Sequence, residues 1–292
     1  MAKFTIQNGQ LSVSVDSLGA ELSSVRHNGT EYLWPGNPQT WNGRAPILFP
    51  IIGPLQDGEY FLDGKTYEMP QHGFARRSEW QLAESAADFL LFRLQDSPQT
   101  WIHYPFAFVL EAGYRIRGNE LECSYRVRSA NSAGTMPFAI GSHTAFRVPI
   151  DPHLSFSDYE LEFEKDEDTL RYLQTAEGPL SGKTVPFRTE NRKLPLEHRF
   201  FADGSIIFKD LASERITIQS SQDTRKASIA FCGFPYCTLW TYLPSSEPYL
   251  CIEPWYGITQ TVDSSKDFRQ REGNLSLESG EEFTCAFQLT LS

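Results

Sequence analysis

A single carboxylate lies in an otherwise apolar and aromatic segment near the end of the chain. The segment reads YLCIEPWYG from 249 to 257, with Glu253 at its centre, and no Lys or Arg occurs between Lys226 and Lys266. Burial disfavours the charged form of a carboxyl group and raises its pKa, which gives a base that takes a proton near neutral pH. Two interpretations stay open here: a catalytic base, or a structural acid whose oxygens accept N–H hydrogen bonds inside a β-sheet.

Two of the six histidines have neighbours that suggest proton transfer. His72 lies in QHGFAR, with Arg76 and Arg77 just after it, and His143 lies in the mostly apolar run PFAIGSHTAF. A histidine in an aromatic pocket can hold or donate a proton close to neutral pH. For either residue alone, a hydrogen-bonded structural histidine is the more common explanation.

Motifs for other chemistries are missing from the sequence. There is no H-x-H, no H-E-x-x-H and no Cys/His pair at zinc-site spacing, so we expect no metal ion. There is also no G-x-S-x-G elbow and no P-loop, which argues against serine hydrolases and nucleotide-dependent enzymes. A glycosidase needs two carboxylates, and only Glu253 has the isolated apolar setting. The remaining chemistry is acid/base work by one Glu and one or two His, without a cofactor.

Composition limits the partners and the cellular location. The net charge of −11 argues against a nucleic-acid partner, because neutralising phosphates needs clustered Lys and Arg. No apolar run reaches the roughly 18 residues of a membrane span, and the N-terminus lacks a secretory apolar core. We therefore expect a soluble cytoplasmic protein whose five cysteines are reduced core thiols.

The elements that would hold these residues are predicted to be strands. Apolar residues alternate at 11, 13 and 15 and again at 121, 123, 125 and 127, which is typical of half-buried strands. The dipeptides Asn28-Gly29, Asp63-Gly64 and Gly118-Asn119 between such segments predict antiparallel hairpins. Further strands are predicted in six runs: DFLLFRL, SIIFKDL, RITIQSS, KASIAFC, YCTLWTYL and EFTCAFQLTLS.

No long segment has a helical period, so helix is expected only in short turns. Closely spaced strands without alternating helices indicate a large antiparallel sandwich or barrel, and we favour a sandwich. The polar interval from Asp158 to Arg199 is interpreted as a solvated excursion, not a linker. The expectation is one all-β domain covering residues 1–292.

Five motifs in order resemble the aldose 1-epimerase (galactose mutarotase) family, in particular its short bacterial mutarotase-like branch. They are GAELSSV from 19, R-x-P-x-L-F-P-x-x-G from 44 to 53, QHGFAR from 71, GSHTAF from 141 and CIEPWYG from 251. The resemblance covers nearly the whole chain. It implies an antiparallel β-supersandwich whose concave face holds a sugar.

The resemblance also implies roles for individual residues. His143 matches the family's general acid, Glu253 its general base and His72 its second, sugar-contacting histidine. The implied reaction is interconversion of the α and β anomers of a free hexose by ring opening and reclosure. Arg44 and Arg76 match basic residues that line the family's pocket.

Other substrate contacts are less closely tied to the family's motifs. Asp203 is a candidate for the family's sugar-gripping acid, although Asp-Gly is equally typical of a turn. Trp255 is a candidate for stacking on the sugar, although aromatic residues of β proteins lie more often in the core. Gln71, beside His72, is a further candidate for binding the sugar. The oligomeric state is left open.

Two alternatives remain. Arg44, Arg76 and Arg77 together resemble the phosphate-gripping arginines of sugar-6-phosphate epimerases in the same superfamily, which suggests a hexose-6-phosphate 1-epimerase. A carbohydrate-binding or sensing protein without catalysis is the alternative from another class. Such a protein has no need for an acid and a base together.

Overall fold

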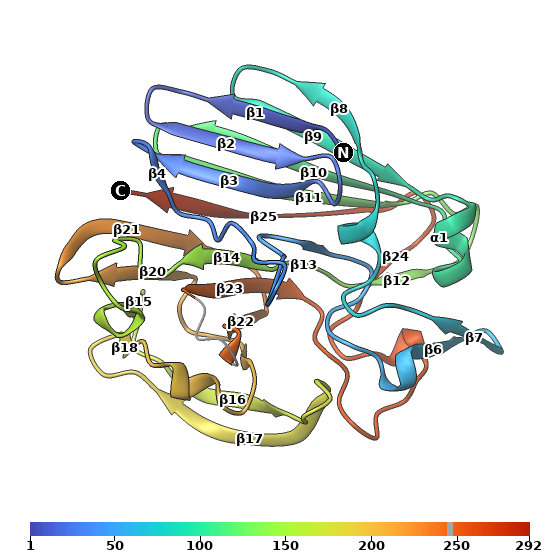
Figure 1. Ribbon diagram of the computed structural model, residues 1–292. Coiled ribbons are helices and arrows are strands. Elements are labelled where there is room, and N and C mark those ends of the chain that lie inside the picture. Colours follow the sequence, from blue (N-terminus) through green and yellow to red (C-terminus); the bar gives the residue numbers. More distant parts are fainter. Residues whose placement is uncertain (244–247) are drawn as a thin grey trace.

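The computed structural model describes residues 1–243 and 248–292, which fold mainly into antiparallel strands (Figure 1). The largest sheet has nine strands. From edge to edge they are β18 (Lys193–Pro195), β15 (Glu160–Phe163), β20 (Arg215–Ser220), β21 (Asp223–Ala230), β25 (Glu282–Leu291), β11 (Glu120–Ser129), β10 (Phe108–Arg117), β9 (Phe89–Gln95) and β8 (Gln81–Ser85). In β11 buried and less buried residues alternate, as expected of a strand with one face in the core.

The second sheet has eight strands and carries the segment around Glu253. Its order is β17 (Leu180–Arg188), β16 (Asp168–Gln174), β19 (Ile206–Lys209), β22 (Tyr236–Trp240), β23 (Tyr249–Tyr256), β13 (Ile140–Ser142) and β5 (Ile47–Leu48), with β14 (Thr144–Arg147) also paired to β23. All residues of β23 except Tyr256 are buried, which explains why this strand is a continuous apolar run without alternation.

Smaller sheets complete the sandwich. Four strands at the N-terminus, drawn in blue in Figure 1, lie against the long strands of the nine-stranded sheet, where Phe4 packs edge-on against Phe92 with ring centroids 5.6 Å apart. They are β1 (Lys3–Gln7), β2 (Leu11–Asp16), β3 (Glu21–His27) and β4 (Thr30–Glu31). Two pairs remain: β6 (Glu59–Leu62) with β7 (Lys65–Glu68), and β12 (Met136–Phe138) with β24 (Leu275–Leu277).

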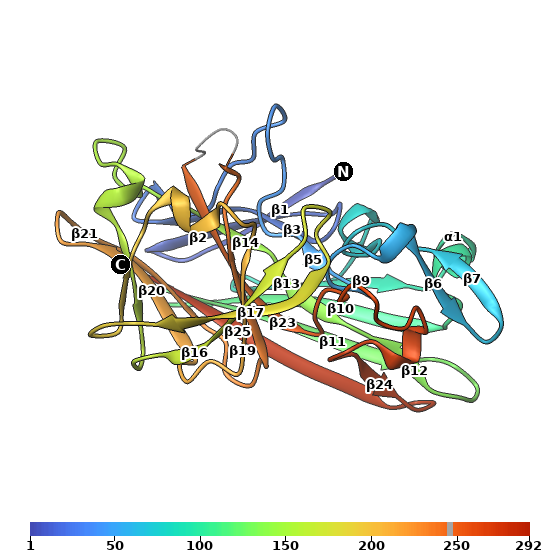
Figure 2. The same cartoon turned by 90° about the horizontal axis from the view of Figure 1, so that it is seen from below.

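Helix is confined to short pieces, as predicted. Among the described residues there is one α-helix, α1 (Pro98–His103), which begins with a capping box between Ser97 and Thr100. The 3₁₀ turns are η1 (Gln56–Gly58), η2 (Ala75–Arg77), η3 (Phe156–Asp158), η4 (His198–Phe201) and η6 (Phe268–Gln270). Seen from below, α1 and the β6–β7 hairpin lie at the opposite end of the molecule from β20 and β21 (Figure 2). None of the helices in 1–243 and 248–292 is long and apolar enough to cross a membrane.

The predicted hairpins and fold class are confirmed. Asn28-Gly29 joins β3 to β4 with φ of 48° and 83°, and Asp63-Gly64 joins β6 to β7 with φ of 49° and 79°. The polar interval from 158 to 199 holds β15 to β18, which period-two alternation did not reveal because several of these strands expose much of their surface. The expectation that every cysteine is a core thiol is wrong for Cys232, which is exposed.

Candidate active site

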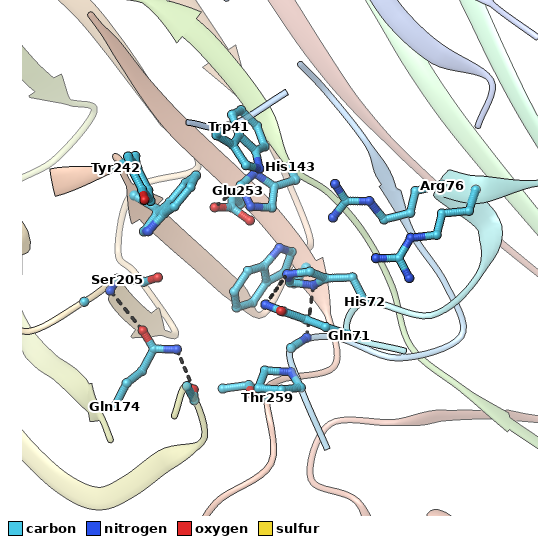
Figure 3. A pocket seen from close by; sticks show the side chains of 17 residues that line it. Trp41, Gln71, His72, Arg76, His143, Gln174, Ser205, Tyr242, Glu253 and Thr259 are labelled. Atoms are coloured by element: carbon cyan, nitrogen blue, oxygen red, sulfur yellow. Dashed lines mark hydrogen bonds and ion pairs between the residues drawn. The ribbon is translucent and has the colours of Figure 1, made fainter. Parts of the chain in front are cut away.

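A cavity of about 460 Å³ opens beside β23 and gathers side chains from distant parts of the sequence (Figure 3). It contains both polar side chains that can exchange protons and aromatic side chains that can face a sugar ring. The lining residues are Trp41, Gly53, Pro54, Gln71, His72, Arg76, Arg77, His143, Gln174, Gly178, Gly204, Ser205, Trp240, Tyr242, Glu253, Trp255 and Thr259.

Glu253 projects into this cavity from β23, in the interior of the eight-stranded sheet. Its side chain is only 1% exposed, and its backbone pairs with Thr238 on β22. Burial raises the pKa of Glu253 well above its usual value, against the opposing effects of the Arg76 charge and the nearby indole N–H of Trp255. Burial therefore favours the protonated form of Glu253 in the folded protein.

His143 lies at an interruption between two short strands. β13 pairs with residues 255 and 256 of β23 while β14 pairs with 249 to 252, so His143 falls in the gap between the two ladders. The gap coincides with Pro254, which has no N–H to donate to a ladder. The interruption lets His143 face Glu253, with Nδ1 and Oε1 3.4 Å apart and without hydrogen-bond geometry.

Aromatic rings enclose the imidazole of His143. Trp41 stacks on it with centroids 4.9 Å apart, and Trp240 meets it edge-on at 5.4 Å. Burial lowers the pKa of His143 well below its usual value, and the neighbouring His72 and Arg76 lower it further. Burial thus favours the neutral forms of both His143 and Glu253, and their closeness allows a shared proton to pass between them.

His72 has its proton fixed on one ring nitrogen. The backbone N–H of Gly53 donates to Nδ1 at 3.1 Å, so the neutral ring carries its hydrogen on Nε2. Nε2 lies 3.3 Å from the side-chain amide of Gln71, which can accept this hydrogen only through its oxygen. Burial lowers the pKa of His72 to about 3, and Arg76 and Arg77 lower it further. With this lowered pKa the neutral ring of His72 is suited to donate a hydrogen bond. It is poorly suited to take up a proton near neutral pH.

Two motif glycines lie where no side chain would fit. A Cβ on Gly73, which has φ of +73°, would lie 2.0 Å from the carbonyl oxygen of Phe49. A Cβ on Gly141 would lie 2.5 Å from Cδ1 of Trp255, whose indole covers that glycine. His72 itself has φ of 63°, an uncommon conformation that the packed turn around Gly73 holds in place.

Arg76 and Arg77 supply positive charge to the cavity from η2. Within the described residues neither forms an ion pair within 4.0 Å, although Arg76 interacts at longer range with Glu21 and Glu253. Burial lowers the pKa of Arg76 below its usual range. Glu253 is the one acidic residue among the described lining residues, and burial favours its neutral form, so the charges of Arg76 and Arg77 dominate the cavity in a chain of net charge −11.

The structure brings together six of the eight residues expected from the sequence: Glu253, His143, His72, Arg76, Gln71 and Trp255 all line the cavity. Two lie outside the lining. The Arg44 guanidinium binds Asp16 at 3.0 Å and the carbonyl oxygen of Pro35 at 2.9 Å. Asp203 is largely exposed and lies 3.4 Å from Arg171, while its neighbours Gly204 and Ser205 line the cavity.

Apart from Arg77, which the sequence analysis named as a phosphate-binding candidate, sequence reasoning missed the remaining side chains of the cavity. Trp41 lies in a loop and Trp240 ends a strand, so neither gives a periodic signal. Gln174 fixes the opposite wall: its amide donates to the carbonyl oxygen of Gly178 at 2.7 Å and accepts from the N–H of Ser205 at 2.9 Å (Figure 3). Only the fold shows that these residues meet.

Arg271 supports the cavity from behind. It is 9% exposed and donates to the carbonyl oxygens of Ile52 at 3.2 Å and Ile258 at 3.4 Å. These residues directly precede Gly53 and Thr259, which line the cavity. Burial lowers the pKa of Arg271 to about 10, and no carboxylate among the described residues forms an ion pair with it.

The chain is similar to known proteins over most of its length. The family model described as aldose 1-epimerase matches residues 2–290. The chain is 30% identical over 271 residues to the chromosomal protein LacX of Lactococcus lactis subsp. lactis, covering 88% of this chain and 89% of LacX.

Two solved structures are similar over nearly their whole length. A galactose mutarotase related enzyme from Lactobacillus acidophilus superposes with a TM-score of 0.94 at 28% identity, covering 100% of this chain and 97% of that one. A galactose mutarotase-like protein from Lactobacillus casei gives 0.92 at 30% identity, covering 100% of both chains.

Proposed function

The chain belongs to the aldose 1-epimerase family, and we propose that it interconverts the α and β anomers of a free hexose by opening and reclosing the ring. One observation carries the proposal: Nδ1 of His143 and Oε1 of Glu253 lie 3.4 Å apart, both side chains buried at the wall of a cavity large enough for a sugar. The two sugar oxygens that exchange protons, O1 and O5, are bonded to the same carbon. Neighbouring acid and base groups can therefore reach both.

The reaction begins when the shared proton moves from Glu253 to His143, which gives a carboxylate and an imidazolium. Glu253 then takes the proton of the O1 hydroxyl while His143 protonates O5. The C1–O5 bond breaks with its electron pair going to O5, and C1 and O1 become a carbonyl. Rotation about C1–C2 presents the other carbonyl face, and reclosure reverses the proton transfers. Protons and electrons balance within the pair, so the step requires no cofactor.

The other lining residues hold the sugar during these transfers. His72 donates from Nε2 to a sugar oxygen, and Gln71 beside it offers both a donor and an acceptor. Arg76 stabilises the negative charge that develops on oxygen as the ring opens, because it interacts with Glu253 through space in a buried site. Trp255 lines the cavity beside Glu253 and offers an apolar surface to the ring.

Polarimetry of freshly dissolved α-D-glucose and α-D-galactose tests the proposal. We expect the protein to accelerate the approach to equilibrium, and Glu253→Gln and His143→Ala to lose about 100- to 10,000-fold of that acceleration. Circular dichroism establishes that both variants fold. Unchanged turnover in either folded variant would overturn the role of that residue. Saturable sugar binding without anomer exchange in the unaltered protein would instead support the carbohydrate-binding alternative.

A second candidate reaction is 1-epimerisation of a hexose 6-phosphate. The observation in its favour is that Arg76 and Arg77 line the cavity without an ion-pair partner among the described residues. Arginine pairs well with phosphate oxygens, and two arginines would offset the phosphate charge. If a phosphate is bound, Arg77→Ala should lower kcat/KM for glucose 6-phosphate at least tenfold more than for glucose. Equal losses for the two sugars would exclude it.

A further inference from the structure

Three ligand-type atoms come together at the inner wall of the cavity. Cys251 and Glu253 are two residues apart on β23, so their side chains project from the same face of the strand. His143 approaches from the gap between β13 and β14. The thiol sulfur, one imidazole nitrogen and one carboxylate oxygen all lie within 4.8 Å of one another.

Two side chains of this group each have a buried polar atom that the rest of the described structure leaves without a hydrogen bond. Nδ1 of His143 and Oε2 of Glu253 are fully buried and have no hydrogen-bond partner among residues 1–243 and 248–292. Buried polar atoms normally have partners, since an unpaired one costs about 1–3 kcal/mol. One unpaired atom on each of two neighbouring buried side chains suggests that the site can hold an additional group.

The spacing and the donor types fit one kind of ligand. Ligand atoms about 2.05 Å from a zinc ion at a tetrahedral angle lie about 3.4 Å apart. Nδ1 of His143 and Oε1 of Glu253 are separated by 3.4 Å. Sulfur, nitrogen and one carboxylate oxygen with an open fourth position form a donor set that zinc accepts and that magnesium, which prefers oxygen ligands, does not.

The charges also favour a divalent ion. A thiolate and a carboxylate together neutralise Zn²⁺, so the buried complex carries no net charge. His143 and Glu253 line the cavity, which gives the ion a route from solvent, while Cys251 is fully buried behind them. Sequence motifs did not reveal this group because the cysteine and histidine are more than 100 residues apart.

We propose that His143, Cys251 and Glu253 form a binding site for one Zn²⁺ ion, and that zinc bound there inhibits the enzyme. The site itself rests on geometry. Inhibition rests in addition on the proposed function, because zinc would occupy the same nitrogen and carboxylate that exchange protons with the sugar. The ion acts as a reversible inhibitor, with its fourth position open to water or a sugar hydroxyl.

Binding is measured on the metal-free full chain by isothermal titration with ZnCl₂, with MgCl₂ as the hard-ion control. We expect one Zn²⁺ per chain and no binding of Mg²⁺. CoCl₂ should give the near-ultraviolet thiolate-to-cobalt charge-transfer absorption that identifies a sulfur ligand. Absence of that band, or zinc binding that is not one ion per chain, would overturn the site.

Variants of two buried cysteines separate this site from adventitious binding. Cys251→Ala should weaken zinc binding at least tenfold and remove the cobalt band. Cys237 is the matched control: it is buried on the adjacent strand β22 near Glu253 but lies outside the three-atom group. Cys237→Ala should leave both signals unchanged. If Cys251→Ala proves unstable, Cys251→Ser takes its place because it preserves the side-chain size. This variant should also lose the cobalt band.

Anomer exchange in the presence of ZnCl₂ tests the inhibition. Zinc should suppress exchange in the unaltered protein, and Cys251→Ala should require at least ten times more zinc for the same suppression. Equal zinc sensitivity of the two proteins would overturn inhibition through this site. A protein that binds one Zn²⁺ through Cys251 but exchanges no anomers under any condition would retain the site and refute the proposed function.

Discussion

Replacing Glu253 by Gln should remove activity and also a pH-dependent loss of stability. Compared with the unaltered protein, the variant should therefore become relatively more stable as the pH rises. In the folded state burial raises the pKa of Glu253 well above 4.5, whereas the unfolded chain ionises it near that value. Between these two pKa values the folded state binds one more proton than the unfolded state. The stability contributed by this extra proton is fully present below pH 4.5 and is lost as the pH rises through the folded pKa.

The magnitude follows from the one-proton difference. The free energy of unfolding should fall by about 1.4 kcal/mol per pH unit while folded Glu253 stays protonated and unfolded Glu253 does not. His72 and His143 act in the opposite sense at lower pH: their folded pKa values are lowered, so stability rises with pH until the unfolded histidines lose their protons near 6.5. The histidines, and the buried cysteines that ionise only in the unfolded chain at higher pH, add slopes of their own, but these are common to the unaltered protein and Glu253→Gln and cancel in the stability difference between them.

The assay is urea unfolding followed by tryptophan fluorescence at pH 5.5, 6.5, 7.5 and 8.5 for the unaltered protein and Glu253→Gln. From above the unfolded pKa of about 4.5 up to the folded pKa of Glu253, the stability difference between the two proteins should shift in favour of Gln by about 1.4 kcal/mol per pH unit. Any constant effect of the Gln amide shifts the difference without changing its slope. Equal m-values establish that the two proteins expose the same surface on unfolding.

Glu111 supplies the matched control. It is 3% exposed, and although burial acts to raise its pKa, hydrogen bonds from Arg93 and Arg126 outweigh that effect and hold the pKa below its usual value. Its folded and unfolded forms are both ionised above pH 7, so Glu111→Gln should lower stability without adding a pH slope. If Glu253→Gln and the unaltered protein instead change in parallel with pH, the carboxyl group is ionised in the folded state and the reasoning is refuted.

Three further substitutions test how the cavity is held. Gly73→Ala should lower the free energy of unfolding by more than the roughly 1–2 kcal/mol of a left-handed backbone alone, because its Cβ would lie 2.0 Å from the carbonyl oxygen of Phe49. The control Gly29→Ala has φ of +83° and no atom of the described residues within 4 Å, so it should show only the backbone cost. Equal losses in urea unfolding would contradict the steric argument. Arg271→Met should lower the free energy of unfolding by about 1–3 kcal/mol, because it leaves the carbonyl oxygens of Ile52 and Ile258 unpaired. A stability equal to that of the unaltered protein would contradict this. Trp41→Ala should admit water to His143 and move its pKa, followed by NMR titration, back toward 6.5, whereas Trp41→Phe should not; an unmoved pKa would refute the enclosure by Trp41.

Much of the fold was predictable because its signals are local. The hairpins follow from dipeptides that accept positive φ, and the strands from alternation on a half-buried surface. The exposed strands β16 and β17 lack that alternation, so only the fold reveals them. The cytoplasmic location, the single domain and the absence of a nucleic-acid partner stay predictions.

The centre of the site was predictable because its residues lie in unusual local settings, such as a lone Glu in an apolar run. The rest was not, because proximity in space depends on the sheet topology. Arg44 is a basic residue within one of the family's motifs and was expected to bind the sugar. Its guanidinium instead contacts Asp16 and the carbonyl oxygen of Pro35, and Arg44 does not line the cavity. Trp41 and Gln174 meet the site only through tertiary structure, as does Cys251 beside His143.

The most direct test of the central claim is the rate of anomer exchange at equilibrium, measured by NMR magnetisation transfer between the α and β signals of glucose, galactose and their 6-phosphates. We expect the unaltered protein to accelerate exchange of at least one of these sugars, and Glu253→Gln at the same concentration to lose about 100-fold or more of that acceleration. Equal exchange in the two proteins, or no acceleration of any of the four sugars, would contradict proton transfer by the His143–Glu253 pair.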